Sequence, residues 1–347
     1  MGVFGMKKFL QQFLMLTFVV VILAACGGNS ASEGEKVTTS GAGESEESKQ
    51  YTFKLGHEAQ ETHVKYATAE KFKEELETRS EGRMKVDIFP ANQLGNEKDI
   101  VQQLETGTLD FGIISNGTMS SRSESMNGWF MPFLFTNLED ANEARKTDAA
   151  AKMLEELQAQ NLIGFDVFFA GNRHLLTKSE VGSIDDLQGL KIRIPGSPVF
   201  EEFWNKVGAG ATPMPLPEVY TSLQTGVIEA VDVDLDALLS QKYYESAKYL
   251  TLTNHITFPE VVLGSKQVFD SLSPDDQQIV KDAWSAAVEW GVQEGIKLEN
   301  SRVDEIKENG VTVTELESTE DFETIANEIY EKYSSNETIK AFIEENK

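Results

Sequence analysis

Two similar segments of this chain each join the end of a helix to the start of a strand. They are Leu104-Glu-Thr-Gly-Thr-Leu-Asp110 and Leu223-Gln-Thr-Gly-Val-Ile-Glu229. In each, a helical pattern ends at a glycine, and an apolar strand with an acidic residue follows. Two copies of this unit predict two lobes of related α/β design, although a match this short also arises by chance.

The rest of the chain alternates between strand and helix patterns. Strands are predicted at 51–55, 84–88, 109–114, 162–169, 190–194, 227–231 and 311–313. Helices are predicted at 66–76, 97–106, 139–158, 199–207, 218–225, 235–250 and 274–307, with two acidic helices at the end. This βαβαβ order predicts mostly parallel sheets covered by helices. Two such lobes that face a shared crevice form a natural site for a small ligand.

Residues 1–25 have the pattern of a secretory signal peptide. Lys7 and Lys8 precede an apolar run at 9–25 that ends in small residues. The run is marginal for a membrane-spanning helix, which needs roughly 20 apolar residues. Cys26 is the only cysteine, so no intramolecular disulfide is possible.

The position of Cys26 directly after Leu23-Ala-Ala25 resembles a bacterial lipobox. The resemblance implies that Cys26 is lipidated, becomes the mature N-terminus and anchors the protein to a membrane. The alternative is an ordinary cleaved signal that leaves a free thiol. Residues 26–50 then form a flexible linker, because Val37 is the only large apolar residue between positions 27 and 50.

The chain is strongly acidic, with 57 Asp and Glu against 31 Lys and Arg and a formal net charge of −26. This charge argues against nucleic acid or an anionic membrane surface as a partner. It does not require a cationic ligand, because a local pair of arginines can bind an anion inside an acidic protein.

Two arginines stand at predicted strand ends. Arg193 ends the short strand in Gly189-Leu-Lys-Ile-Arg-Ile-Pro195, and Arg173 follows the strand at 162–169. A guanidinium on a rigid support can bind a carboxylate through two parallel hydrogen bonds. The two arginines could flank one ligand carboxylate, and the alternative is that they form structural ion pairs with the many acidic residues.

The sequence offers little for catalysis. It has no Walker-type phosphate loop, no Gly-x-Gly-x-x-Gly and no nucleophile elbow. His57-Glu58 begins like a zinc-protease motif, but Glu61 occupies the position of the second histidine. We therefore expect no metal, no cofactor and no enzymatic activity.

Several motifs, in this order, resemble the DctP-type substrate-binding component of a tripartite ATP-independent periplasmic (TRAP) transporter. After the lipobox they are Gln93-Leu-Gly95, Leu104-x-Thr-Gly-x-Leu-Asp110, Gly189-Leu-Lys-Ile-Arg-Ile-Pro195, Pro217-Glu-Val-Tyr220 and Leu223-Gln-Thr-Gly226. The resemblance implies an α/β, two-lobed periplasmic-binding-protein-like fold with a hinge and a long helix that crosses both lobes. The implied lobes are 51–172 plus about 259–300, and 173–258 plus about 301–347.

The same resemblance implies the ligand-binding residues. Arg193 matches the arginine that pairs with the ligand carboxylate, and Arg173 matches a second arginine that the family often uses. Four further positions fall where family members reach their ligand: Glu58, Glu97, Ser115 and Asn116.

The chain departs from the family after Leu223-Gln-Thr-Gly226. Many relatives carry Glu-Asn where this chain has Asp232-Val233, and valine cannot donate the hydrogen bond that the asparagine gives the carboxylate. We expect Asp232 or Asp234 to accept from a ligand hydroxyl or amine instead, or to bind a cation. A hydroxylated sugar acid, a uronate or an aldonate, is therefore favoured over four-carbon dicarboxylates and sialic acid.

The resemblance thus implies a monomeric extracytoplasmic lipoprotein that captures an organic acid anion by lobe closure. It would deliver this ligand to TRAP membrane permease subunits. The alternative is a ligand-binding sensor subunit for a membrane histidine kinase, which a neighbouring permease gene would exclude. A sugar-acid enzyme is a distant third.

Overall fold

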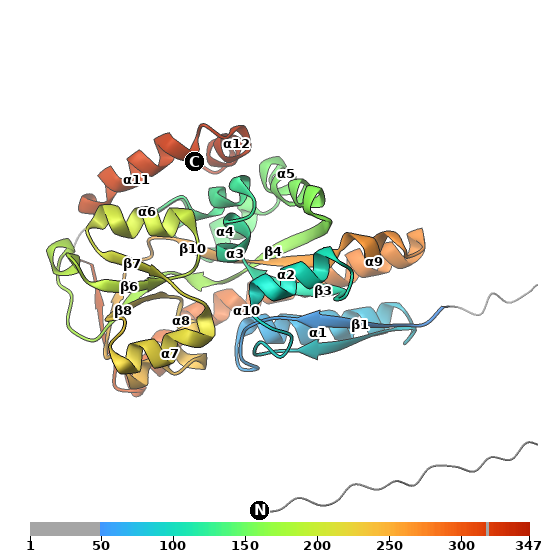
Figure 1. The fold of residues 1–347 in the computed structure, drawn as a ribbon, viewed down its shortest axis with the longest axis horizontal. Coiled ribbons are helices and arrows are strands. Elements are labelled where there is room, and N and C mark those ends of the chain that lie inside the picture. The colour runs from blue at the N-terminus through green and yellow to red at the C-terminus, as the bar shows by residue number, and fades with distance from the viewer. Residues whose placement is uncertain (1–48, 317–318) are drawn as a thin grey trace, which may run out of the picture. The chain divides into compact units, whose positions relative to one another are not determined.

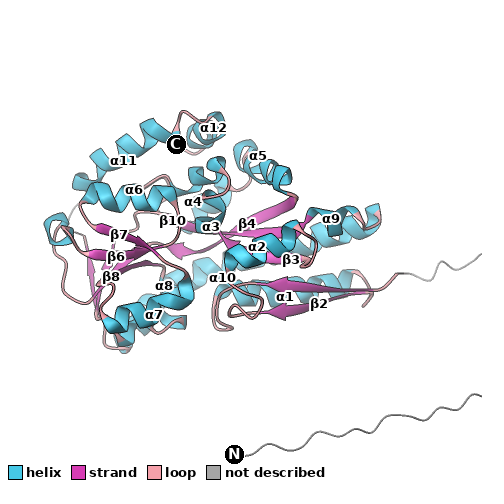
Figure 2. Cartoon of the chain, viewed as in Figure 1, coloured by secondary structure: helices cyan, strands magenta, loops and turns pink. Residues whose placement is uncertain are grey.

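The computed structural model describes residues 49–316 and 319–347 (Figures 1 and 2). The predicted signal peptide, Cys26 and nearly all of the predicted linker lie outside the described residues. Within the described part, no helix combines the length and apolarity needed to cross a membrane.

The first sheet has five strands in the order β2-β1-β3-β10-β4. They are β1 (Tyr51–Gly56), β2 (Met84–Phe89), β3 (Phe111–Ser115), β4 (Leu162–Asn172) and β10 (Thr257–Ser265). β1 pairs in parallel with β2 and β3, as the βαβαβ pattern predicts, whereas β10 runs antiparallel to β3 and β4. The sheet is mixed because β10 enters it from β9 of the second sheet, without a crossover helix.

The helices that cover this sheet bury the apolar faces that the sequence predicts. α1 (Val64–Arg79) buries Phe72 and Leu76, and Phe72 stacks on Trp284 with 3.5 Å between ring centroids. α2 (Glu97–Glu105) begins at a capping box, in which Asn96 and Asp99 bond to each other's backbone N–H groups.

The second sheet has six strands in the order β11-β9-β5-β8-β6-β7. They are β5 (His174–Thr177), β6 (Lys191–Ile194), β7 (Gly210–Pro213), β8 (Ala230–Val233), β9 (Tyr249–Leu252) and β11 (Thr312–Glu315). β6 lies parallel to β7 and β8, while β5 is antiparallel to β8 and β9. α6 (Pro198–Val207) and α7 (Leu216–Thr225) connect the parallel strands.

Two helix predictions are wrong. The expected helix at 139–158 is divided into α4 (Leu138–Ala144) and α5 (Asp148–Glu156), because Thr147 caps a new helix by accepting from the Ala150 N–H. The expected helix at 235–250 stops early. α8 (Leu235–Ser240) ends before Lys242, which has a left-handed φ of 57°, and a short turn η4 (Tyr243–Glu245) leads into β9.

Short helices complete the described part of the chain. They are α3 (Asn116–Ser120), η1 (Glu124–Phe130), η2 (Leu157–Gln160), η3 (Ile184–Leu187), α9 (Lys266–Asp270), α11 (Glu320–Tyr333) and α12 (Glu337–Glu345).

The chain passes between the two sheets at Arg173, which joins β4 to β5, and at 253–256, which join β9 to β10. The predicted long helix is confirmed as α10 (Pro274–Glu308), which packs on α1 and β4 of one sheet's layer and on α8 and β11 of the other. The lobe boundaries stay a prediction. α11 packs on α6 and α12 on α5 and η1, so the C-terminal helices contact elements of both predicted lobes.

Candidate functional site

A small cavity of about 30 Å³ lies where the two predicted lobes meet. Charged side chains from both lobes line it: Glu58, Lys65 and Glu260 from the first, and Arg173, Arg193 and Asp234 from the second. A larger hollow of about 660 Å³ lies beside α11, but it is lined by no arginine and its charged residues are exposed. The small cavity is therefore the candidate site, because buried charges converge on it.

Arg193 lies at the end of β6, and the residue is only 4% exposed. Its Nε and Nη2 donate to the carbonyl oxygen of Met214 at 3.1 and 2.8 Å. Among the described residues, no carboxylate oxygen lies within 4.0 Å of its guanidinium, so it forms no ion pair there. Burial lowers the pKa of Arg193, yet arginine remains protonated in proteins. The site therefore holds a buried cation with no described carboxylate in ion-pair distance, which favours an anionic ligand.

Arg173 is buried too, but two carboxylates neutralise it. Its Nε donates to Asp232 Oδ1 at 2.6 Å and its Nη1 to Asp234 Oδ2 at 2.9 Å, while Nη2 donates to the Asp232 carbonyl. The guanidinium lies 4.5 Å from the centre of the Phe258 ring. These contacts fix Arg173 at the wall of the cavity.

Asp232 uses both carboxylate oxygens within the protein. Besides the bond from Arg173, its Oδ2 lies 2.7 Å from Trp204 Nε1 and 2.8 Å from His255 Nε2. Burial raises the pKa of Asp232, but His255 and Arg173 outweigh this effect and lower it to about 2. Asp232 is thus a fixed anion that positions Arg173.

Asp234 plays a related part at the start of α8. Its Oδ1 caps the helix by accepting from the Ala237 N–H at 2.7 Å. His63 Nε2 lies 4.0 Å from the same oxygen. Because its other oxygen binds Arg173, Asp234 holds the arginine and the helix together while it lines the cavity.

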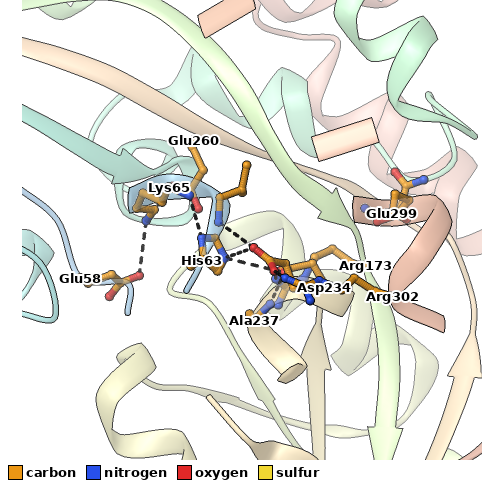
Figure 3. A network of polar contacts seen from close by, with 12 residues as sticks. Glu58, His63, Lys65, Arg173, Asp234, Ala237, Glu260, Glu299 and Arg302 are labelled. Carbon is orange, nitrogen blue, oxygen red and sulfur yellow. Dashed lines mark hydrogen bonds and ion pairs between the residues drawn. The ribbon is translucent and has the colours of Figure 1, made fainter. Parts of the chain in front are cut away.

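The first-lobe wall is a cluster of three glutamates around one lysine. Lys65 Nζ lies 2.8 Å from Glu260, 3.4 Å from Glu97 and 4.0 Å from Glu58. Figure 3 shows Glu58, Lys65 and Glu260 on one side of His63, and Asp234, Arg173 and Arg302 on the other. Burial lowers the pKa of Lys65, but the three carboxylates outweigh this effect and raise the pKa above its ordinary value.

A further contact joins the two lobes at the rim of this site. Asp236 of α8 accepts from the backbone N–H of Val64, at the start of α1, at 2.7 Å. Its other oxygen accepts from Arg302 of α10 at 2.8 Å. Asp236 therefore ties α1 of the first predicted lobe to α8 and α10.

The structure brings five of the eight predicted ligand-binding residues to the cavity wall: Glu58, Ser115, Arg173, Arg193 and Asp234. The other three lie outside the lining. Glu97 binds Ser115 and Thr118, Asn116 donates to the Met126 carbonyl at 2.9 Å, and Asp232 holds Arg173. Contact of any of the eight with a ligand stays a prediction.

Sequence reasoning missed four residues that shape the site: Lys65, Trp204, His255 and Glu260. Glu260 left a usable signal, because it is the one acid in the otherwise apolar run Phe258-Pro-Glu-Val-Val-Leu263. Lys65 left none, since a lysine in the first turn of a helix usually faces solvent.

Comparison with known proteins identifies similar chains. Residues 55–336 match the family described as bacterial extracellular solute-binding protein, family 7 (DctP). The ectoine/5-hydroxyectoine-binding periplasmic protein UehA of Ruegeria pomeroyi is 33% identical over 289 residues, which cover 81% of this chain and 85% of UehA.

Two solved structures of sugar-acid complexes are similar in fold. The sugar acid binding protein DctPAm of Advenella mimigardefordensis, in complex with galactonate, has a TM-score of 0.82 at 26% identity and covers 85% of this chain and 97% of its own. A TRAP periplasmic solute binding protein of Xanthobacter autotrophicus with bound β-D-galacturonate has a TM-score of 0.80 at 27% identity and covers 84% and 98%.

The bonds of Asp232 give a stability prediction. Asp232→Asn keeps the size of the side chain but leaves Arg173 with one carboxylate. Its amide N–H would also face the N–H groups that donate to Asp232. We expect the free energy of unfolding in urea to fall by about 3–5 kcal/mol, as when one partner of a buried ion pair is removed. Asp304→Asn, whose side chain is 88% exposed, is the control and should change stability by less than about 0.5 kcal/mol. Equal stability of the two variants would contradict the assigned role.

Proposed function

Because the chain belongs to family 7 of the bacterial extracellular solute-binding proteins, the DctP family, we propose that it captures a sugar acid outside the cytoplasm and delivers it to the membrane permease of a TRAP transporter. The observation that carries the proposal is the buried guanidinium of Arg193, which lines the cavity and has no carboxylate partner among the described residues. A ligand carboxylate would supply the missing counter-ion through two parallel hydrogen bonds.

The rest of the cavity wall suits a polyhydroxylated ligand. Glu58 and Glu260 present carboxylates and Ser115 a hydroxyl, and these groups can accept hydrogen bonds from ligand hydroxyls. Uronates and aldonates combine one carboxylate with several hydroxyls. The galactonate and galacturonate complexes of the structural neighbours support the same ligand class.

Capture requires the lobes to open. The charged side chains that line the cavity from both walls are almost fully buried, so a ligand can reach them only when the walls separate. The contact between Asp236 and the Val64 N–H must therefore break or shift when the ligand enters. The ligand then favours closure because it bonds to both walls only when they meet.

We propose in addition that Cys26, which lies outside the described residues, is the lipid anchor. Expressed in a bacterial host with its leader, the wild-type protein should partition into the detergent phase of Triton X-114 and incorporate labelled palmitate. Cys26→Ser should abolish both, whereas the nearby control Ser30→Ala should change neither. A Cys26→Ser protein that still incorporates palmitate would exclude this anchor.

The ligand-binding test uses Arg193→Ala with D-galactonate and D-galacturonate in calorimetric titrations. Without the guanidinium the ligand carboxylate is buried unpaired, so we expect the dissociation constant to rise by at least about 100-fold, or roughly 3 kcal/mol. Arg79→Ala, in an exposed ion pair on α1, is the control and should bind as the wild type does.

The melting temperature of the ligand-free variant shows whether Arg193 is needed for folding instead of for binding. Arg193→Ala removes a buried cation but also two hydrogen bonds to the Met214 carbonyl, so the melting temperature of the ligand-free protein should change little. Unchanged affinity would remove Arg193 from the site. If neither sugar acid raises the wild-type melting temperature and ectoine does, the sugar-acid proposal is wrong.

A further inference from the structure

The lysine-centred wall contains more negative charge than it can neutralise. Lys65 supplies one ammonium to Glu58, Glu97 and Glu260, all within 4.0 Å of it. The side chains of Lys65, Glu97 and Glu260 are 2%, 6% and 4% exposed, and that of Glu58 is 11% exposed. Buried carboxylates of like charge repel one another around one ammonium, and this repulsion favours a bound proton in the wall.

Glu97 is the carboxylate that stays ionised. Its two oxygens accept from the Ser115 N–H at 2.6 Å, the Ser115 hydroxyl at 2.5 Å and the Thr118 hydroxyl at 2.6 Å. Burial raises the pKa of Glu97, but Lys65 and these donors bring it below the ordinary value. The proton must then reside on Glu58 or Glu260.

These two glutamates lack comparable donors. Among the described residues, no group donates a hydrogen bond to the carboxylate of Glu58, and Glu260 Oε2 has only its ion pair with Lys65. Burial raises the pKa of Glu260 to about 7 and that of Glu58 well above its ordinary value. Both side chains face the cavity.

We propose that Glu58 and Glu260 share one proton and together determine specificity, accepting the hydroxylated end of a sugar acid and excluding a ligand that carries a second carboxylate at that end. The inference rests on the proposed function, in which the first carboxylate binds Arg193. A ligand hydroxyl can donate to the ionised member of the pair. A second carboxylate would face it as a like charge, and could enter only with a further proton.

Other charged or titratable groups surround the pair and are part of this balance. They are Lys65 and His63 at the start of α1, Glu97 on α2, Arg193 on β6, Asp234 at α8 and Tyr243 in η4. Of these, Lys65 and Arg193 favour the ionised pair, while Glu97 and Asp234 favour the proton.

The test compares D-galactonate with galactarate, which differ only in having a hydroxymethyl group or a carboxylate at carbon 6. At pH 8 we expect the wild type to bind galactonate at least about 50-fold more tightly. Because galactarate must bring one more proton, its dissociation constant should fall by up to tenfold for each pH unit from 8 to 6, while that of galactonate changes little.

Two variants locate the effect. Glu58→Gln and Glu260→Gln should each reduce the preference at pH 8 to below about fivefold and flatten the pH dependence of galactarate binding. Glu74→Gln, whose side chain is 68% exposed, is the matched control and should behave as the wild type. A wild type that binds both acids equally, or Gln variants that keep the full preference, would overturn the proposal.

A measurement without ligand separates this proposal from the proposed function. Burial raises the pKa of Glu260 to about 7 in the folded protein, from 4.5 for a glutamate exposed to water. Between these two pH values the folded protein therefore holds one proton more than the unfolded chain. The unfolding equilibrium constant of the wild type should therefore rise with pH across this window, by up to tenfold per unit, relative to Glu260→Gln. If no sugar acid binds but this difference is present, the proposed function fails and the shared proton stands. Identical pH profiles would exclude the shared proton whatever the ligand.

Discussion

The contrast between the two buried arginines determines the chemistry of this site. Arg173 is neutralised by Asp232 and Asp234, whereas Arg193 donates only to the carbonyl of Met214. A protein interior tolerates a charge when it is paired, so Arg173 belongs to the scaffold and Arg193 is available to an anion. Under the proposed function, burying Arg193 unpaired makes closure of the lobes depend on an anionic ligand in the cleft.

The fold places these groups by ending strands at the crevice. Arg193 is near the end of β6, Arg173 is the residue at which the chain passes from β4 to β5, and Asp232 lies on the neighbouring strand β8. Ser115 and Glu58 follow the same rule in the first lobe, at the ends of β3 and β1. Lys65 and Asp236 come from helix starts, which brings α1 and α8 together at the rim. The second-lobe wall contains one guanidinium, that of Arg193, without a described carboxylate in ion-pair distance, whereas the first-lobe wall has three carboxylates around one ammonium.

Local patterns were sufficient to predict much of this architecture. The spacing of apolar residues predicted α1, α2, α6, α7 and the long α10, and the Ser273-Pro274 start of α10 was readable from capping chemistry alone. The antiparallel strands β5, β9 and β10 were not predicted, because their short apolar runs carry no period that separates strand from buried helix. Tyr249 and Leu250, the first two residues of β9, were included in the predicted helix at 235–250 for that reason.

The candidate site was partly predictable in the same sense. The strand-end position of Arg193 was visible in the sequence, but whether an arginine is paired depends on residues distant along the chain. Asp232 lies 59 residues from the arginine it neutralises. The cluster around Lys65 joins three elements, with Glu260 contributed by a strand late in the chain. Such groupings follow from the tertiary fold, and no local pattern in the sequence encodes them.

A crystal structure of the protein with D-galactonate would show whether Arg193 is the carboxylate-binding group. We expect both carboxylate oxygens at about 2.7–2.9 Å from the guanidinium nitrogens of Arg193, with the ligand hydroxyls toward Glu58 and Glu260. A carboxylate bound elsewhere, with Arg193 still donating only to the Met214 carbonyl, would contradict this expectation.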